Sequence, residues 1–236
     1  MRPVLNLVRL KNKNIFQQLQ LEEALLRADD QNWCLIQDGV DPSIVMGISG
    51  RAEEALNLPL LQQSPVPVVR RFSGGGTVFV DSNTAFVTFI FQSNVFNIST
   101  CPDKVFCWSD AIYRSVFDGL PYSLKERDYI LENRKFGGNA QYLRKDRWLH
   151  HSTLLWNYDP QNMDYLLLPP RRPAYRQDRH HKDFLCSLSD YLPAREELWT
   201  RLSHVLEKNF SINEKTFGEI SPILDRPHRR STEILA

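Results

Sequence analysis

This sequence of 236 residues lacks the long apolar runs and the cysteine clusters that mark several protein classes. No stretch approaches the roughly 20 consecutive apolar residues of a membrane span, so we expect no interaction with a membrane. The four cysteines form no C-x-x-C pair and have no histidines at zinc spacing, which favours reduced thiols over a zinc site. An excess of one charge sign is also missing, because 29 Lys and Arg residues face 28 Asp and Glu residues. Proteins that grip nucleic acid non-specifically need a basic excess, so we expect no nucleic-acid partner.

The N-terminus has no continuous apolar core before a small-residue cleavage site, so no secretory signal is predicted. We expect a cytoplasmic protein, with an organelle matrix as the alternative because no acidic residue precedes Glu22. The composition, 42% hydrophobic and 24% charged, is ordinary for a globular chain and excludes disordered and fibrous classes. At this length we expect one domain over residues 1–236.

Apolar periodicity predicts helices interspersed with pairs of short strands. The predicted helices are 15–28, 51–57 (ending before Pro59), 103–117 and 195–208. The predicted strands are 4–10, 33–37, 43–48, 68–72, 77–80, 85–91, 129–131, 136–143 and 148–156. This order differs from strict alternation of strands and helices, so it favours an α+β fold in which helices flank a mixed β-sheet. A proline-rich and basic segment, 169–182, interrupts the pattern and reads as a linker.

Three successive glycines follow two arginines in the segment 69–79 (VRRFSGGGTVF). Glycines weaken a β-rich segment, so they need a reason such as a positive φ or the close approach of a ligand. Backbone N–H groups beside a guanidinium form a cradle for a phosphate or a carboxylate. No Gly-Lys-Ser/Thr follows, so the segment is not a P-loop. A flexible hairpin turn remains the alternative interpretation of these glycines.

Two further segments carry polar chemistry next to β-rich runs. In 133–142 (NRKFGGNAQY) a lysine stands beside a glycine pair, and such a compact cation can contact a carboxylate and a phosphate together. A solvated surface lysine is the alternative interpretation. In 149–155 (LHHSTLL), two adjacent histidines begin an apolar strand. Side chains at neighbouring positions of a strand face opposite sides of the sheet, so only one of the two histidines can face the active site.

Together, 70–81 (RRFSGGGTVFVD), 134–141 (RKFGGNAQ) and 150–155 (HHSTLL) resemble the lipoate-protein ligase A family, relatives of biotin protein ligases and octanoyltransferases. The resemblance covers about residues 4–188. It implies the biotin/lipoyl protein ligase catalytic-domain fold. It also implies a two-step reaction, in which ATP activates lipoate as lipoyl-AMP and the lipoyl group passes to a protein lysine. ATP and Mg²⁺ are the implied cofactors.

The resemblance also assigns roles by position. Lys135 is the implied catalytic residue, and Asp128 is the implied carboxylate near Mg²⁺. An apolar tunnel for the acyl chain is expected along Val78, Phe79 and Phe89. The residues implied to bind substrate and nucleotide are Arg71, Gly74, Gly75, Gly76, Thr77, Val78, Phe79, Lys135, Gly138, Ala140, His151 and Thr153.

The implied partners are the lipoyl domains of 2-oxoacid dehydrogenase E2 subunits or the glycine-cleavage H protein. Longer family members carry a C-terminal accessory domain, and we expect none within these 236 residues. A separate accessory chain is therefore one expectation. The basic segment 171–182 is a candidate loop that closes over the adenylate or meets an acidic acceptor.

Two other functions stay open. One is an octanoyl- or lipoyltransferase that uses a thioester or carrier donor without ATP. Cys186, close to His180 and His181 in the sequence, is its candidate nucleophile, and a buried structural thiol is the alternative. The other is a non-catalytic relative that binds lipoyl-AMP.

Overall fold

The computed structural model describes residues 2–11, 13–96, 98, 101–169 and 172–235. Within these residues the strands form an eight-stranded sheet and a four-stranded sheet. The strands are β1 (Val4–Leu10), β2 (Trp33–Asp38), β3 (Ser43–Met46), β4 (Val68–Arg70), β5 (Val78–Val80), β6 (Thr84–Gln92), β7 (Tyr122–Lys125), β8 (Asp128–Leu131), β9 (Arg134–Leu143), β10 (Arg147–Leu155), β11 (Ser211–Lys215) and β12 (Glu233–Ile234). The α-helices are α1 (Ile15–Ala28), α2 (Ala52–Ala55), α3 (Leu58–Gln63), α4 (Pro102–Val116), α5 (His181–Phe184), α6 (Arg195–Asn209) and α7 (Phe217–Ile220). Short 3₁₀ helices are η1 (Pro160–Tyr165), η2 (Ala174–Arg176), η3 (Leu188–Asp190) and η4 (Ser221–Asp225).

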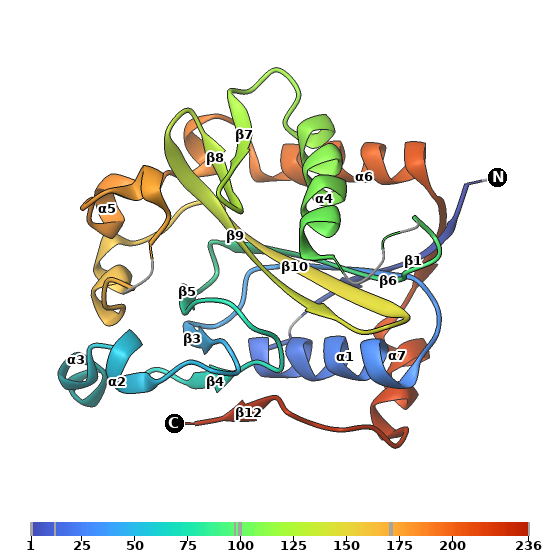
Figure 1. Cartoon of the computed structure of the whole chain (residues 1–236), viewed down its shortest axis with the longest axis horizontal. Coiled ribbons are helices and arrows are strands. Elements are labelled where there is room, and N and C mark those ends of the chain that lie inside the picture. The colour runs from blue at the N-terminus through green and yellow to red at the C-terminus, as the bar shows by residue number, and fades with distance from the viewer. Residues whose placement is uncertain (1, 12, 97, 99–100, 170–171, 236) are drawn as a thin grey trace.

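The large sheet has the order β11-β1-β2-β6-β10-β9-β8-β7. Its β1 runs parallel to β2 and β11, while the remaining pairs are antiparallel. Helices α4 and α6 cover one face and α1 covers the other (Figure 1). A mixed sheet flanked by helices was predicted from the sequence, and this architecture confirms it.

The small sheet has the order β12-β4-β3-β5 and packs beside the N-terminal half of α1. The two strands that flank the glycine triplet, β4 and β5, do not pair with each other. Both pair with β3, which runs parallel to β4 and antiparallel to β5. The glycine segment is therefore a connection across a third strand, and the alternative interpretation as a flexible hairpin turn is wrong.

Helix α1 has the predicted bounds because its start is well marked. Asn14 accepts a hydrogen bond from the Gln17 backbone, and the Gln17 side chain accepts one from the Asn14 backbone, which is a capping box. The apolar face of α1 is buried, and it also buries the polar side chains of Gln18, Glu22 and Glu23. Three polar groups on a buried face need partners. Gln18 and Thr88 donate to Glu22, which also lies beside His151, and Glu23 accepts from the chain near its C-terminal end.

The region 51–63 differs from the prediction of one helix ending before Pro59. Helix α2 ends at Ala55, and α3 begins at Leu58 with Pro59 in its first turn. Proline has no N–H to donate, and the first turn of a helix needs none there, so Pro59 begins a helix instead of following one.

The residues after α6 fold back onto the domain. Strand β11 joins the edge of the large sheet beside β1, and β12 joins the small sheet beside β4. The buried Glu23 carboxylate accepts hydrogen bonds from the Ser231 and Thr232 backbone N–H groups at 2.9–3.0 Å. Arg70 pairs with Glu233 at 2.6 Å. These contacts attach the C-terminal segment to the strand that leads into the glycine triplet.

In the part of the chain that the structure describes, no helix is both long and apolar enough to cross a membrane.

Candidate functional site

The three sequence motifs meet where the small sheet lies against β9 and β10. A Cβ placed on Gly75 would lie 3.2 Å from the Ala140 side chain, which joins the first motif to the second. The Ser73 hydroxyl lies 3.3 Å from His151 Nε2, which joins the first motif to the third. Strands β9 and β10 pair directly, with Gly138 opposite Thr153. The structure thus brings the predicted segments into one site.

Arg71 holds the glycine loop, residues 73–76, from inside. Its Nη2 donates to the carbonyls of Gly74 and Gly76, each at 2.8 Å, and its Nε donates to Gly74 at 3.1 Å. Arg71 is buried, and burial lowers its pKa to about 10, opposed by the nearby Glu22 carboxylate. The guanidinium therefore fastens the loop while it also lines the adjacent pocket.

The carbonyl contacts determine which way the loop amides point. In a trans peptide the C=O and the following N–H point in opposite directions. Because the Gly74 and Gly76 carbonyls face Arg71, the N–H groups of Gly75 and Thr77 face away from it. Gly75 and Gly76 are exposed. The loop therefore offers two backbone donors to an anion on its outer side.

Two glycines are required by the folded backbone itself. Gly75 has φ +103°, a conformation that residues with a Cβ rarely adopt. Gly47, which follows β3, allows the loop to pass closely, since a Cβ there would lie 2.2 Å from the Gly75 carbonyl oxygen. By contrast, a Cβ on Gly74 or Gly76 would meet no described atom within 4 Å.

Lys135 lies on β9 next to this loop. Its Nζ is 2.7 Å from Asp128 Oδ1, and the Tyr175 hydroxyl donates to Asp128 Oδ2 at 2.9 Å. A Cβ on Gly138 would lie 3.5 Å from both Lys135 Nζ and Thr153 Oγ1. Asp128 and Tyr175 therefore hold the Lys135 ammonium group near Gly138, which has no side chain and so leaves space beside the lysine.

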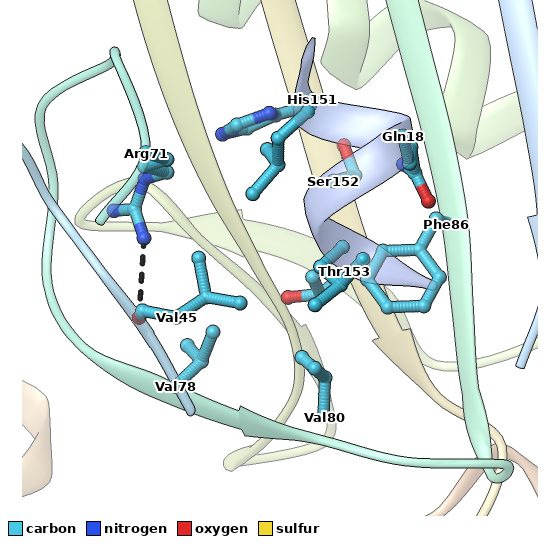
Figure 2. Close-up of a pocket in the computed structure, with 11 residues that line it drawn as sticks. Gln18, Val45, Arg71, Val78, Val80, Phe86, His151, Ser152 and Thr153 are labelled. Carbon is cyan, nitrogen blue, oxygen red and sulfur yellow. Dashed lines mark hydrogen bonds between the residues drawn. The ribbon is translucent and has the colours of Figure 1, made fainter. Parts of the chain in front are cut away.

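A pocket of about 30 Å³ lies between α1, the small sheet and β10, with Thr153 in its lining (Figure 2). About two water molecules would fill it. Its lining is mostly apolar and includes four residues of the predicted site: Arg71, Val78, His151 and Thr153. The other lining residues are Ile15, Gln18, Leu19, Val45, Val80, Phe86 and Ser152.

The three residues expected along an apolar tunnel lie in different surroundings. Val78 lines the pocket, but Phe79 stacks on Tyr165 with ring centroids 5.5 Å apart. Phe89 packs on Trp108 on the opposite face of the large sheet. Successive residues of a strand face opposite sides, so Phe86 faces the pocket and Phe89, three residues later, faces the other side.

The two adjacent histidines face opposite sides of the sheet, as the strand geometry predicts. His151 faces the pocket, with its Nδ1 2.9 Å from Glu22 Oε2. His150 is buried on the other face, with its Nε2 2.7 Å from the Tyr129 hydroxyl. Sequence reasoning missed Glu22 as a member of the site. Its position on the apolar stripe of α1, three residues after Leu19, is the signal that could have found it.

The buried position of His150 allows a prediction of how the free energy of unfolding depends on pH. Burial, and secondly the charge of His151, lower its pKa from 6.5 to about 3. Between pH 3 and pH 6.5 this imidazole binds a proton in the unfolded chain but not in the folded chain. The free energy of unfolding is therefore highest, as far as this group is concerned, above pH 6.5, and it decreases as the pH falls below that value. We expect a loss of about 1.4 kcal/mol per pH unit from this group, measurable by urea unfolding at pH 4.5–7.5.

His150→Gln should flatten this pH slope, and the matched control His204→Gln, at an exposed position of α6, should not. Equal slopes in both variants would contradict the assignment to His150.

Cys186 does not have the surroundings of a nucleophile. Burial raises the pKa of its thiol to about 11, although Arg134 opposes the shift. Its Sγ donates to the Arg134 carbonyl at 3.5 Å, and its backbone N–H donates to the Lys135 carbonyl at 2.9 Å. Activated cysteines have a lowered pKa. The interpretation as a structural thiol fits this site better.

The described part of the basic segment, 172–182, packs against the turn between β7 and β8. Glu126 accepts hydrogen bonds from the backbone N–H groups of Ala174 and Tyr175 at 2.6 and 3.1 Å. Tyr175 is buried and contacts Asp128 as described above. Arg171, which belongs to the predicted basic loop, lies outside the described residues.

Among the described residues, no group of three or more His, Cys, Asp or Glu side chains is arranged to hold a metal ion by itself. Magnesium commonly takes one or two carboxylates together with phosphate oxygens and waters, so a single carboxylate such as Asp128 meets its needs when a nucleotide is bound.

Residues 14–210 match the family described as the lipoyl protein ligase A/B catalytic domain. Among curated relatives, the chain is 22% identical over 245 residues to an inactive lipoate-protein ligase 2 of Plasmodium falciparum, covering 78% of this chain and 63% of the relative. It is 31% identical over 178 residues to the lipoate-protein ligase LplJ of Bacillus subtilis, covering 73% and 52%. The chain therefore spans about half to three fifths of the length of these relatives.

Solved structures share the fold. A protein from T. acidophilum with bound lipoic acid superposes with a TM-score of 0.77 at 19% identity, covering 96% of this chain and 93% of that one. A lipoate-protein ligase A bound with ATP gives 0.76 at 20% identity, with coverage of 96% and 93%. A bipartite lipoate protein ligase from Thermoplasma acidophilum, described with its E2 lipoyl domain, gives 0.74 at 21% identity, with coverage of 95% and 90%.

Proposed function

Because this chain belongs to the lipoyl protein ligase A/B catalytic-domain family, we propose that it is a lipoate-protein ligase. In the first step it joins lipoate to ATP, forming lipoyl-AMP and releasing pyrophosphate. In the second step the amine of an acceptor lysine attacks the mixed anhydride, and AMP leaves. The relatives and structures that bear lipoate-ligase names support this proposal.

The observation that carries the proposal is the position of Lys135. Adenylation brings a carboxylate and a phosphate together, so the site must offset the negative charge of both groups as it develops. Lys135 Nζ and the Thr153 hydroxyl both lie 3.5 Å from the position of a Cβ on Gly138. Thr153 lines the pocket, and Asp128 holds the lysine in place. A single cation at this point can contact both reacting anions.

The remaining roles follow from the geometry of the loop. The exposed N–H groups of Gly75 and Thr77 are donors for the phosphates. Arg71 keeps these amides in position through the loop carbonyls. The pocket beside it, of about 30 Å³, would have to open further to receive the acyl chain. Magnesium would neutralise the ATP phosphates when bound, and Asp128 is the carboxylate that would hold it.

The acceptor in this proposal is a lipoyl domain of a 2-oxoacid dehydrogenase E2 subunit or a glycine-cleavage H protein. Positioning supplies most of the rate of the second step, because no covalent enzyme intermediate is needed. The relative described as a bipartite ligase with its E2 lipoyl domain supports both this partner class and the participation of a separate accessory chain.

The test is a half-reaction assay with lipoate and Mg-ATP. We expect the purified protein to release pyrophosphate and form lipoyl-AMP, alone or after addition of an accessory chain. If no adenylate forms but the protein transfers a lipoyl or octanoyl group from a carrier, the transferase alternative holds instead. Tight binding of lipoyl-AMP without any turnover would identify it as a non-catalytic member of the family, which also contains a relative described as an inactive lipoate-protein ligase 2.

Gly76→Ala is predicted to affect ligand binding without affecting the fold. A Cβ there meets no described atom within 4 Å, and Gly76 does not need a positive φ. Stability should therefore change by less than about 0.5 kcal/mol. The KM for ATP should rise at least about tenfold if phosphates approach this backbone. Gly218→Ala, at an exposed position of α7, is the matched control, and an unchanged KM in Gly76→Ala would contradict the assigned role of the loop.

A further inference from the structure

The glycine loop, residues 73–76, contains a single residue with a side chain, which is Ser73. Ser73 is 0% exposed, and its hydroxyl lies 3.3 Å from His151 Nε2 on β10. The glycines have no side chain that could pack against a neighbour, and a Cβ on Gly74 or Gly76 would meet no described atom within 4 Å. The loop therefore depends on individual hydrogen bonds to stay in one conformation.

These hydrogen bonds hold the loop from two sides. The Ile48 backbone N–H donates to the Ser73 carbonyl at 2.9 Å, and Arg71 donates to two of the glycine carbonyls. Ile48 and Arg71 lie next to β3 and β4, so both contacts tie the loop to the small sheet. In the part of the chain that the structure describes, the contact of Ser73 with His151 is the hydrogen bond that joins the loop to the large sheet.

The group on the other side of His151 determines the direction of this hydrogen bond. His151 Nδ1 lies 2.9 Å from Oε2 of Glu22, which is 0% exposed. Oε1 of the same carboxylate accepts from the Thr88 hydroxyl at 2.7 Å and from the Gln18 amide at 2.8 Å. A carboxylate accepts and does not donate, so Nδ1 carries the proton and Nε2 of the neutral ring is an acceptor. Ser73 therefore donates its hydroxyl proton to His151.

The resulting series of hydrogen bonds, from Glu22 through His151 to Ser73, directs the polar atoms of His151 at the loop. Both ring nitrogens are bonded within the protein, so neither is available to a ligand while the series is intact. His151 still lines the pocket with its ring (Figure 2). The hydrogen bonds of His151 thus act on the loop whose outward N–H groups are the donors proposed for the phosphates.

We propose that Ser73 is a positioning residue for the nucleotide. Through its hydrogen bond to His151, it holds the glycine loop in the conformation in which the outward N–H groups face the phosphates of ATP. Glu22 supports this role because it fixes the tautomer of His151. The inference rests on the proposed function, since it requires ATP at this loop. Lipoate binding does not need this hydrogen bond, because Ser73 is not part of the pocket lining.

The experiment measures the KM for ATP and the KM for lipoate in lipoyl-AMP formation by the intact chain. Ser73→Ala removes the hydroxyl and adds no bulk. We expect the KM for ATP to rise about tenfold, the effect of losing one hydrogen bond, and the KM for lipoate to stay within about twofold. Ser109→Ala is the matched control, because Ser109 on α4 is also 0% exposed and donates to the Phe106 carbonyl at 3.0 Å. It should leave both KM values unchanged.

A double-mutant cycle separates positioning from a direct contact between Ser73 and the nucleotide. His151→Asn keeps an amide N–H for Glu22 but has no acceptor at the place of Nε2. If Ser73 acts through His151, Ser73→Ala raises the KM for ATP in the wild-type background and has no further effect in the His151→Asn background. An equal rise in both backgrounds overturns the inference, because Ser73 then acts on the nucleotide without His151.

Nitrogen NMR of the wild-type protein gives a second readout, which needs neither a variant nor turnover. We expect the His151 ring at neutral pH to carry its proton on Nδ1 and none on Nε2. A proton on Nε2 overturns the inference, because Ser73 cannot donate to a protonated nitrogen. If the wild type forms lipoyl-AMP but Ser73→Ala leaves the KM for ATP unchanged, only this inference fails. If the wild type forms no adenylate, with or without an accessory chain, the proposed function fails and this inference fails with it.

Discussion

Lys135→Ala is expected to lower the rate of acyl-adenylate formation about 100- to 1000-fold, the typical effect of removing one preorganised group that stabilises developing charge. Lys135 is the cation beside Gly138 and Thr153, where we propose that the carboxylate meets the α-phosphate. The loss should appear mainly in kcat, because the developing charge exists only in the transition state. Pyrophosphate release and lipoyl-AMP formation measure it directly.

The fold should survive this change, because the Tyr175 hydroxyl still donates to Asp128 after the lysine is removed. Circular dichroism and thermal melting check this. Lys145→Ala is the matched control, since Lys145 is an exposed lysine in the turn between β9 and β10. Adenylate formation at the wild-type rate by Lys135→Ala would remove the lysine from the mechanism.

Gly47→Ala is expected to destabilise the protein by about 3 kcal/mol, at the upper end for overpacking a buried position. The added Cβ would lie 2.2 Å from the Gly75 carbonyl oxygen and 3.1 Å from the Gly75 carbonyl carbon. Both atoms belong to the backbone, so no side chain can rotate away and the glycine loop itself must move. Thermal melting should show a decrease of about 6–12 °C for a chain of this size.

Activity should fall together with stability in this variant, because the displaced loop carries the amides proposed to contact the phosphates. Gly218→Ala again serves as the control, since its Cβ would meet only the Thr216 hydroxyl at 4.0 Å. A Gly47→Ala protein that melts and turns over like the wild type would show that the loop is free to move at this contact.

Local signals explain which elements could be predicted. The bounds of α1 and β1 match the prediction because a capping residue, a helical period and a short apolar run are all written into adjacent residues. Strand pairing was not accessible in this way. The inserted β3 between β4 and β5 is contributed by residues more than 20 positions earlier in the chain, and no local pattern reports such a contact.

The residues of the candidate site also divide into those with a local sequence signal and those whose role depends on distant contacts. The glycine triplet and Lys135 were found because unusual residues stand together in the sequence. Gly47 was missed because its role depends on a loop that is distant in sequence. Phe89 was expected along the acyl tunnel, but its side chain lies on the face of the sheet away from the pocket, because a shift of one residue along a strand moves a side chain to the other face. Glu22 stands among apolar residues of α1. Besides Gln18 on the same helix, its partners are Thr88 on β6 and His151 on β10, so only the folded chain identifies its role.

The short strand β12 has a consequence for how copies of this protein behave toward one another. Leu235 donates to the Val68 carbonyl at 2.7 Å, and Glu233 and Ile234 pair with Arg70 and Val69. Without this cover, β4 would present a row of free backbone groups at the edge of the small sheet. Such an edge is a template for pairing with another chain, whereas a two-residue edge strand is a poor one. We therefore expect that removing the segment anchored by Glu23 would make copies of this protein more prone to associate through the edge of β4.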